Sequence, residues 1–314
     1  MKKNFSIRLI SNDEIQKVTD WARLEGFAPG FDDISIYKNT DKKGIWVGCL
    51  DNDPIGSIAC VKYNSSYGFI GLFIVKKEFR NMGYGVRLWK HALDYLKNVG
   101  CIGLEAAPNR LDDYQRWGFK KSSITNRWKL EGIQDLPNGN FYKDDNNTFS
   151  VVPGNQIPPE AVLIYDSQRE PSPRPHFLND WLKNSFGNVS ALVDNNGMCH
   201  GFGRIRPCML QDNNKGWRIG PLLADTPPLA ELLIRKLVRN LEAQILLDCS
   251  NLNPYANYLL SSMGFKEISQ TYRMYKGIQP SCPMNQVYGL ACLEGASHFS
   301  NTSYFFLLLF IFHN

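Results

Sequence analysis

The chain has 314 residues, a length typical of two domains, and 43% of them are hydrophobic, which excludes an intrinsically disordered protein. The net charge of +5 comes from 35 basic and 30 acidic residues without a long basic run, unlike the pattern of a nucleic-acid-binding protein. The eight cysteines show no C-x-x-C spacing, so we expect free thiols and neither a metal site nor a disulfide framework. The N-terminal MKKNFSIRLIS lacks the apolar segment of a secretory signal, and we expect a cytoplasmic protein.

The first half of the chain alternates between strand and helix patterns. Residues 5–10 predict a strand, and residues 11–26 predict a helix that Ser11 or Asn12 caps and Gly26 ends. Further predicted strands are 44–50, 55–63, 67–75 and 102–107, and further predicted helices follow residue 85 and cover 111–119. The first of these two helices has apolar spacing at Val86, Trp89, Leu93 and Leu96. These elements indicate an α/β fold with a mixed sheet and helices on both faces.

The second half repeats the first. GFKKSSITNR begins at Gly118 and GFKEISQTYR begins at Gly264, and six of the ten aligned positions are identical. A polar stretch, PNGNFYKDDNN at 137–147, separates the copies. We therefore predict one domain at 1–135, a linker at 136–150, a second domain at 151–280 and a C-terminal tail at 281–314.

The tail contains the apolar run YFFLLLFIF at 304–312. A bilayer span needs about 20 such residues, so we predict no clear membrane span. The run fits a sticky tail, a packed strand or an alternative chain end, and we assign it no catalytic role.

The stretch RNMGYG at 80–85 lies between a predicted strand and a predicted helix. It does not match the G-x-x-x-x-G-K-[ST] phosphate loop, and the third glycine of a dinucleotide fingerprint is absent because Leu88 stands there. Two interpretations are left. The stretch is either an ordinary turn, or a pyrophosphate cradle in which Gly83 and Gly85 admit a ligand, backbone N–H groups bind it and Arg80 adds positive charge.

R-x-x-G-x-G between an apolar strand and an amphipathic helix resembles the acetyl-CoA signature of the GCN5-related N-acetyltransferases, the GNAT superfamily. The segments GLFIVKKEFRNMGYGVRLWKHAL and IGLEAAPNRLDDYQRWGF carry this resemblance over about residues 5–132. RIGPLLAD, NPYANYLLSSMGF and YRMYKG in the second half resemble the degenerate second domain of a bacterial-type subfamily. The resemblance implies two tandem GNAT-like domains, each a mostly antiparallel twisted sheet flanked by helices.

The resemblance also implies acetyl-CoA as co-substrate, no metal, and the residues that bind the cofactor. Backbone groups of Phe73, Ile74 and Val75 are expected to bond the pantetheine arm as an added strand would. Asn109 is expected to bind the pantetheine, or else to be a turn or cap residue. The expected pyrophosphate loop consists of Arg80, Asn81, Met82, Gly83, Tyr84, Gly85 and Val86.

The resemblance also implies a catalytic role for Tyr114, because the family usually has a tyrosine four residues before Gly-Phe, here Gly118. Its phenol is expected to protonate the departing CoA thiolate or to stabilise it by a hydrogen bond, or else to be an aromatic of the core or surface. The general base is less defined. Glu105 is one candidate, Asp33 and Glu25 are others, and a water chain without any side chain is a further alternative.

The implied activity is N-acetyltransferase, with an enzyme transferring acetyl from acetyl-CoA to a small-molecule or peptidyl amine in a ternary complex. A non-catalytic acyl-CoA-binding sensor is the alternative, since it would keep the glycine loop and need no base. We make no prediction of the oligomeric state.

The second copy departs from the signature. It has DTPPLAEL where the glycine loop should be, and its prolines remove N–H donors. Leu260 takes the position of Tyr114. We therefore expect that this domain does not bind acetyl-CoA and walls the acceptor site instead. Arg169 and Arg174 either line that cleft or belong to an exposed loop.

Overall fold

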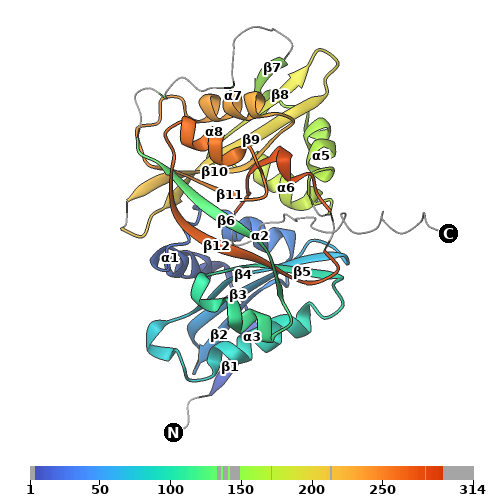
Figure 1. The fold of residues 1–314 in the computed structure, drawn as a ribbon. Coiled ribbons are helices and arrows are strands. Elements are labelled where there is room, and N and C mark those ends of the chain that lie inside the picture. Colours follow the sequence, from blue (N-terminus) through green and yellow to red (C-terminus); the bar gives the residue numbers. More distant parts are fainter. Residues whose placement is uncertain are drawn as a thin grey trace, which may run out of the picture.

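The structure is a computed structural model that describes residues 4–132, 136, 141, 149–170, 172–212, 214–279 and 281–292. Two lobes are stacked on one another, and two long strands, β6 and β12, cross between them (Figure 1). The apolar run at 304–312 lies outside the described residues.

The strands form one sheet, in the order β1-β2-β3-β4-β5-β12-β6-β11-β10-β9-β8-β7, with β13 paired to β10. Most neighbours are antiparallel, and β4–β5 and β10–β11 are parallel. The bounds are β1 Phe5–Leu9, β2 Ile45–Leu50, β3 Asp53–Lys62, β4 Tyr67–Val75, β5 Cys101–Ala106, β6 Lys120–Leu130, β7 Phe149–Pro153, β8 Asn188–Asp194, β9 Cys199–Met209, β10 Lys215–Ala224, β11 Ile245–Ser250, β12 Lys266–Gly277 and β13 Val287–Gly289.

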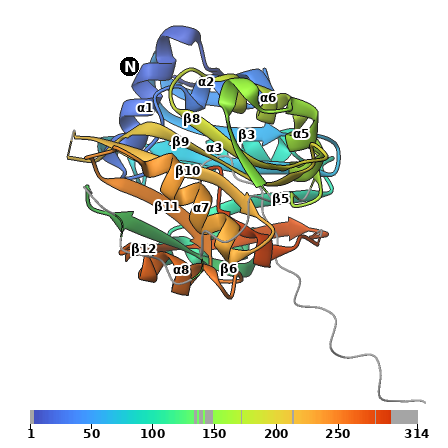
Figure 2. The same ribbon diagram turned by 90° about the horizontal axis from the view of Figure 1, so that it is seen from above.

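Helices cover both faces of the sheet. They are α1 Ile15–Leu24, α2 Asp33–Thr40, α3 Tyr84–Tyr95, α4 Leu111–Arg116, α5 Pro159–Ser167, α6 Pro175–Lys183, α7 Pro227–Val238 and α8 Ala256–Ser262. Short 3₁₀ turns are Asn12–Glu14, Lys77–Phe79, Pro108–Arg110, Gly154–Gln156 and Met284–Gln286. Seen from above, α2 of the first half lies beside α6 of the second half (Figure 2). The rings of Tyr37 and Trp181 stack there with centroids 6.4 Å apart.

The two halves exchange their last strands. β6 comes before the predicted linker, yet it pairs with β11 of the second half, from Ile245 opposite Leu130 to Ser250 opposite Thr125. β12 comes from the second half and pairs with β5 of the first, with Arg273 opposite Glu105. The first lobe therefore consists of β1–β5 and β12, and the second lobe of β7–β11, β13 and β6. The predicted boundary at 136–150 does not divide the sheet, because the pairing crosses it.

Most predicted elements of the first half are present, and the structure differs from the predictions at four places along the chain. Helix α2 has no predicted counterpart, and Val86, assigned to the apolar face of α3, is 51% exposed beside the glycine loop. Arg169 and Arg174 are buried in ion pairs with carboxylates of their own lobe, so the exposed-loop alternative for them is wrong. The predicted tail begins with ordered residues, including β13.

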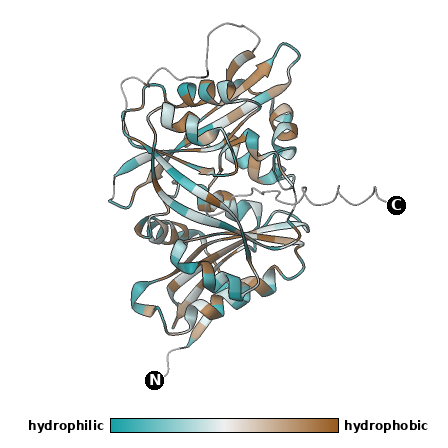
Figure 3. Cartoon of the chain, viewed as in Figure 1, coloured by the Kyte–Doolittle hydropathy of each residue, from teal (hydrophilic) through white to brown (hydrophobic). Residues whose placement is uncertain are grey.

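Hydrophobic side chains join the two lobes into one interior. One core cluster combines Ile34 and Tyr37 of the first half with Phe177 and Trp181 of the second. Hydrophobic residues concentrate on the strands of both lobes, whereas the first half of β12 is hydrophilic (Figure 3). All eight cysteines are buried free thiols.

A buried ionic cluster fixes the exchanged strand β6 to the second lobe. Asp248 on β11 accepts hydrogen bonds from Arg127 on β6, at 2.7 and 3.1 Å, and from Arg218 on β10, at 2.6 Å. The side chains of Asp248 and Arg218 are fully buried. Burial alone would raise the pKa of Asp248, but the charges of Arg127 and Arg218 outweigh it and lower this pKa to about 2.

We expect Asp248→Asn to lower the free energy of unfolding by about 3–5 kcal/mol, because it leaves two buried guanidinium groups without a carboxylate. Urea unfolding at neutral pH measures this change. Asp94→Asn is the matched control, since Asp94 is 75% exposed in a surface pair with Lys97 and should matter little.

The pH dependence of the free energy of unfolding, measured for wild type and Asp248→Asn, shows whether the charge of Asp248 causes this loss of stability. Since the pKa of Asp248 is lower in the folded state than its ordinary value of 3.8, its contribution is complete above about pH 4 and is lost toward pH 2. The difference in free energy of unfolding between wild type and Asp248→Asn should therefore become smaller as the pH falls from about 4 toward 2. A difference that stays constant with pH would show that charge is not the cause.

Candidate acyl-CoA site

Strand β4 leaves its neighbour β5 halfway along its length. The two strands pair from Tyr67 opposite Cys101 to Ile70 opposite Leu104, and β5 then continues with β12 as far as Ala106. Residues 71–75 of β4 keep β3 as partner on one side but pair with no described strand on the other. We call this the unpaired edge of β4. Two carbonyls of this edge already accept side-chain hydrogen bonds, that of Leu72 from Ser57 and that of Val75 from Arg80. The rest of the edge has room beside it for an extended chain, and it contains Phe73, Ile74 and Val75, the residues expected to bond the pantetheine arm.

Leu72 marks the point of departure. It has φ +47°, an unusual value for a leucine within a buried strand, and the register between β3 and β4 shifts opposite it. The hydroxyl of Ser57 donates to the Leu72 carbonyl at 2.9 Å, which holds the bulge. No residue pattern in the sequence marks this bulge, because leucine is not a residue type that indicates left-handed backbone.

The RNMGYG stretch forms the turn from β4 into α3. Gly83 is the N-cap of α3 with φ +84°, and an added Cβ there would meet no atom within 4 Å. Asn81 also has positive φ, at +62°. The first N–H groups of α3, from Tyr84 on, have no acceptor within the helix. The turn therefore presents free donors, positive helix-dipole potential and open space, the properties of an anion cradle.

Other residues of the predicted loop differ in role. Gly85 lacks positive φ, and a Cβ there would make ordinary contacts with Phe73 and Val75 at 3.5 Å. Met82 is 61% exposed at the turn. Arg80 donates to the Val75 carbonyl at 2.7 Å and pairs with Glu25 at 2.5 Å, so its charge already has a partner and it also supports the turn.

Tyr114 lies on α4, and Asn109 is exposed in the turn before it. The Tyr114 ring packs against Trp89 of α3, with centroids 5.1 Å apart, and no hydrogen bond of its hydroxyl occurs among the described residues. Burial raises the pKa of Tyr114 to about 12. A phenol this weakly acidic donates a hydrogen bond to a thiolate rather than transferring its proton.

Each predicted candidate for the general base is held in an ion pair. Glu105 accepts from Thr125 at 2.9 Å, Thr271 at 2.8 Å and Arg273 at 2.6 Å, all on the exchanged strands. Glu25 pairs with Arg80, as above. These carboxylates have structural partners, and Glu105 in particular joins β5 to β12 and β6.

Asp33 is likewise occupied, and it links the lobes. It makes a bidentate pair with Arg206 of β9, with both distances 2.8 Å. Burial would raise the pKa of Asp33, but the Arg206 charge outweighs it and lowers this pKa. No sequence pattern indicates Arg206 as the partner of Asp33, because the two residues are 173 positions apart.

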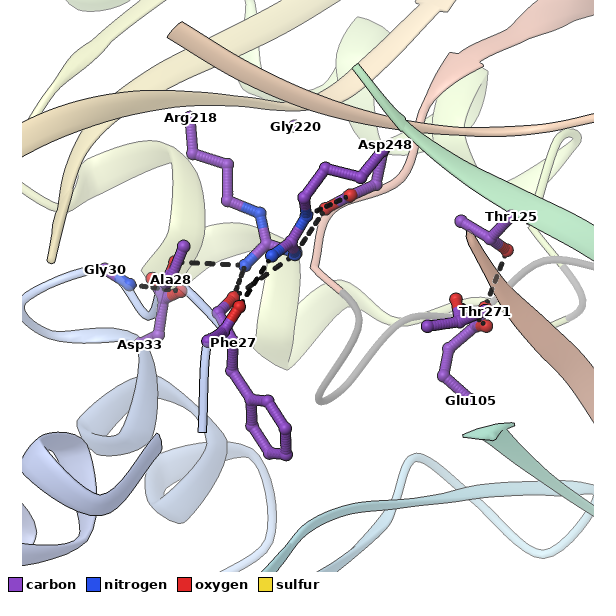
Figure 4. A network of polar contacts seen from close by, with 12 residues as sticks. Phe27, Ala28, Gly30, Asp33, Glu105, Thr125, Arg218, Gly220, Asp248 and Thr271 are labelled. Atoms are coloured by element: carbon purple, nitrogen blue, oxygen red, sulfur yellow. Dashed lines mark hydrogen bonds and ion pairs between the residues drawn. The ribbon is translucent and has the colours of Figure 1, made fainter. Parts of the chain in front are cut away.

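The second lobe also holds the loop between α1 and α2. Arg127 donates to the carbonyls of Gly26 at 2.9 Å and Phe27 at 3.2 Å, and Arg218 donates to those of Phe27 at 3.3 Å and Ala28 at 3.2 Å. Figure 4 shows the guanidinium of Arg218 reaching Phe27 and Ala28, with Asp248 on its other side, and Glu105, Thr125 and Thr271 as a separate group. The two arginines fix residues 26–28, the segment directly after Glu25.

The corresponding position of the second lobe is filled by the protein itself. Parallel pairing of β10 with β11 stops at Ile219 opposite Leu247, and β13 then pairs with β10 at Leu222 and Leu223. The N–H of Leu290, just after β13, donates to the Asp248 carbonyl of β11 at 2.8 Å. Strand β10 of the second lobe corresponds to β4 of the first. Strand β13 pairs with β10 at the position where the unpaired edge of β4 has no described strand beside it.

The glycine loop is also missing from the second lobe. Strand β10 ends at Ala224, and helix α7 begins at Pro227 after the N-cap Thr226. Pro227 and Pro228 lack N–H groups. Leu260, the counterpart of Tyr114, is fully buried in the core. Within the described residues there is no cluster of metal-binding side chains, and no helix there is long and apolar enough to cross a membrane.

Two family models match the chain. The Acetyltransferase (GNAT) family matches residues 13–119, and an Acetyltransferase (GNAT) domain matches residues 162–289. The chain belongs to the GNAT superfamily and contains two GNAT-like domains. The first GNAT match ends at residue 119, just before the exchanged strand β6. Acyl transfer is the general reaction of this family.

Relatives along most of the chain agree with a tandem GNAT arrangement. A holothin acyltransferase from Pseudoalteromonas sp. (strain SANK 73390) is 27% identical over 90% of this chain and 92% of its own length. The crystal structure of a putative acetyltransferase from Pyrococcus horikoshii has a TM-score of 0.73 at 22% identity, covering 93% of this chain and 95% of that chain. A tandem GNAT protein from the clavulanic acid biosynthesis pathway has a TM-score of 0.63 at 12% identity, covering 89% and 100%. At these identities the two structures show the fold alone.

We expect Gly83→Ala to weaken acetyl-CoA binding at least about tenfold, because the methyl group would project into the open space of the turn and φ +84° strains alanine. Isothermal titration calorimetry measures the affinity.

Gly197→Ala is the matched control. Gly197 has φ +80° and open space around it, but it lies in the turn between β8 and β9. Both variants should lose about 1 kcal/mol of stability. Equal acetyl-CoA affinities in the two variants would contradict the assignment of the turn at Gly83 as a phosphate cradle.

Proposed function

We propose that the protein is an N-acetyltransferase that moves an acetyl group from acetyl-CoA to an amine in a ternary complex, with the first lobe as the acetyl-CoA site. The two GNAT matches support acyl transfer, and the Pseudoalteromonas relative is a holothin acyltransferase.

The observation that carries the proposal is the pairing of two features in one lobe. The unpaired edge of β4 offers backbone groups to an extended arm, and the Gly83 turn at the end of the same strand offers N–H groups to phosphates. Pantetheine and pyrophosphate are joined in that order in CoA. In the second lobe β13 takes the first place and prolines replace the second.

Acetyl-CoA supplies the acetyl group as a thioester, and the acceptor amine displaces the CoA thiol while losing its own proton. Residues 73–75 would hold the arm through backbone bonds, and an N–H at this edge would polarise the thioester carbonyl. Tyr114 would donate a hydrogen bond that stabilises the leaving thiolate. Residues 81–86 would bind the pyrophosphate, with Arg80 supporting the turn and Asn109 beside the arm.

No side chain is assigned as general base. The carboxylates of Glu105, Asp33 and Glu25 are already engaged in ion pairs with Arg273, Arg206 and Arg80, and the Arg206 charge also lowers the pKa of Asp33. The amine would lose its proton to water instead. The same observation favours a second candidate function, an acyl-CoA-binding sensor without turnover, which also requires the first-lobe site.

The direct test is CoA release from acetyl-CoA across a panel of small amines and lysine-containing peptides, with calorimetry of acetyl-CoA binding in parallel. We expect binding and acceptor-dependent CoA release. Binding without release on the whole panel would favour the sensor. Absence of binding would overturn both functions.

For Tyr114→Phe we expect kcat to fall about 100-fold while the dissociation constant of acetyl-CoA stays unchanged, because the phenol acts only on the leaving group. Steady-state kinetics and calorimetry separate these quantities. Tyr258→Phe on α8, where the side chain is 56% exposed, is the control and should leave both values unchanged. Wild-type kcat in Tyr114→Phe would remove this residue from the mechanism.

A further inference from the structure

A surface hollow lies where the two lobes meet. Its volume is about 510 Å³, within the usual range for sites of small ligands. Ala28, Leu210, Leu246 and Ile268 form its apolar part, and Gln211 and Gln244 are among its polar lining residues. Its wall includes Gly26 and Ala28, the segment that Arg127 and Arg218 hold in place.

The hollow and the end of the β4–β5 pairing lie along one face of the exchanged strands. Alternate residues of a strand share a face, and on β6 these include Thr125 and Arg127. Arg127 lines the hollow, whereas Thr125 bonds Glu105. Glu105 directly follows Leu104, the last partner of β4. The path from Arg127 on β6 to Glu105 on β5 is therefore about 7 Å along β6 and about two strand spacings, roughly 10 Å, across the sheet.

Strand β12 runs beside β6 and follows the same route. Ser269 lines the hollow and lies opposite Arg127, whereas Thr271, two residues later, bonds Glu105. Both exchanged strands thus connect the hollow to the place where the thioester would lie. Of these two strands, β6 comes from the first half of the chain and β12 from the second.

We propose that this hollow is the acceptor site, with the second lobe positioning one wall through Arg127 and Arg218. This inference rests on the proposed function. The charged residues that line the hollow are Arg127, which Asp248 neutralises, and Asp212. The site therefore suits a small amine with an apolar body and uncharged polar groups, since none of its described lining residues offers an unpaired cation to a carboxylate or phosphate.

The test places an amine in the hollow covalently. Ser269→Cys and, separately, Ile268→Cys are alkylated with short and long bromoalkylamines, which form a stable thioether. Both positions are exposed, and the native cysteines are buried. After addition of acetyl-CoA, mass spectrometry measures the gain of one acetyl group. In this step the tethered amine forms the amide bond, the C–S bond of the thioester breaks, and CoA leaves as the thiol.

Ile278→Cys with the same labels is the control. Ile278 is 86% exposed and lies beyond the other end of β12, five residues from Arg273, whereas Ser269 lies four residues away on the side of the hollow. We expect the longer labels at 269 or 268 to be acetylated at least tenfold faster than those at 278, and Gly83→Ala to remove this difference.

The outcomes separate the two proposals. Acetyl-CoA binding with equal acetylation at all three positions overturns the hollow as acceptor site and leaves the proposed function in place. Absence of acetyl-CoA binding overturns the proposed function itself. A best substrate from the amine panel that carries a carboxylate or phosphate would overturn the assigned acceptor class.

Discussion

The buried pairing of Asp248 with Arg127 and Arg218 is the interaction on which the rest of the structure depends. It fixes the exchanged strand β6 to β11 and β10 of the second lobe, and its arginines bind the carbonyls of residues 26–28 in the first. A buried ion pair contributes little net stability compared with an apolar replacement, but it tolerates no missing partner. Its value here is positional, because the segment it holds follows Glu25, which pairs with Arg80 at the glycine turn.

The duplication explains why one site and not two is proposed. Both lobes have a strand that leaves its parallel neighbour, which is a geometric consequence of the shared fold. In the second lobe β13 completes the sheet at that place, and the helix after β10 begins with prolines. The second lobe thus shows from within the molecule what fits this position, namely an extended chain bonded through its backbone. The first lobe has the same edge without a described strand beside it, and adds a turn with free N–H groups.

Local patterns in the sequence predicted local structure well. The apolar run of β4, the hairpin of β2 and β3 and the turn before α3 follow from short-range chemistry, and the structure contains each of them. The strand exchange could not be predicted, because the segments at 120–130 and 266–277 follow nearly the same Gly-Phe-Lys sequence and suit either sheet. Their choice depends on long-range partners such as Glu105 for Arg273.

The candidate site likewise has features that the sequence predicted and features that depend on contacts between distant residues. The motif located Gly83, Arg80 and Tyr114, since each has a fixed spacing from its neighbours. It did not distinguish Gly83, whose positive φ requires glycine, from Gly85, whose backbone does not. It also proposed Glu105 and Asp33 as bases without reference to Arg273 and Arg206, because the sequence does not reveal which arginines neutralise them.

Hydrogen–deuterium exchange with and without acetyl-CoA tests the central claim most directly, because it reports on backbone N–H groups and the claim concerns these groups. The account predicts protection of residues 71–75 and 81–86 on addition of acetyl-CoA, and none at 220–228, the corresponding part of the second lobe. Protection at 220–228, or acetyl-CoA binding without protection at 81–86, would contradict it.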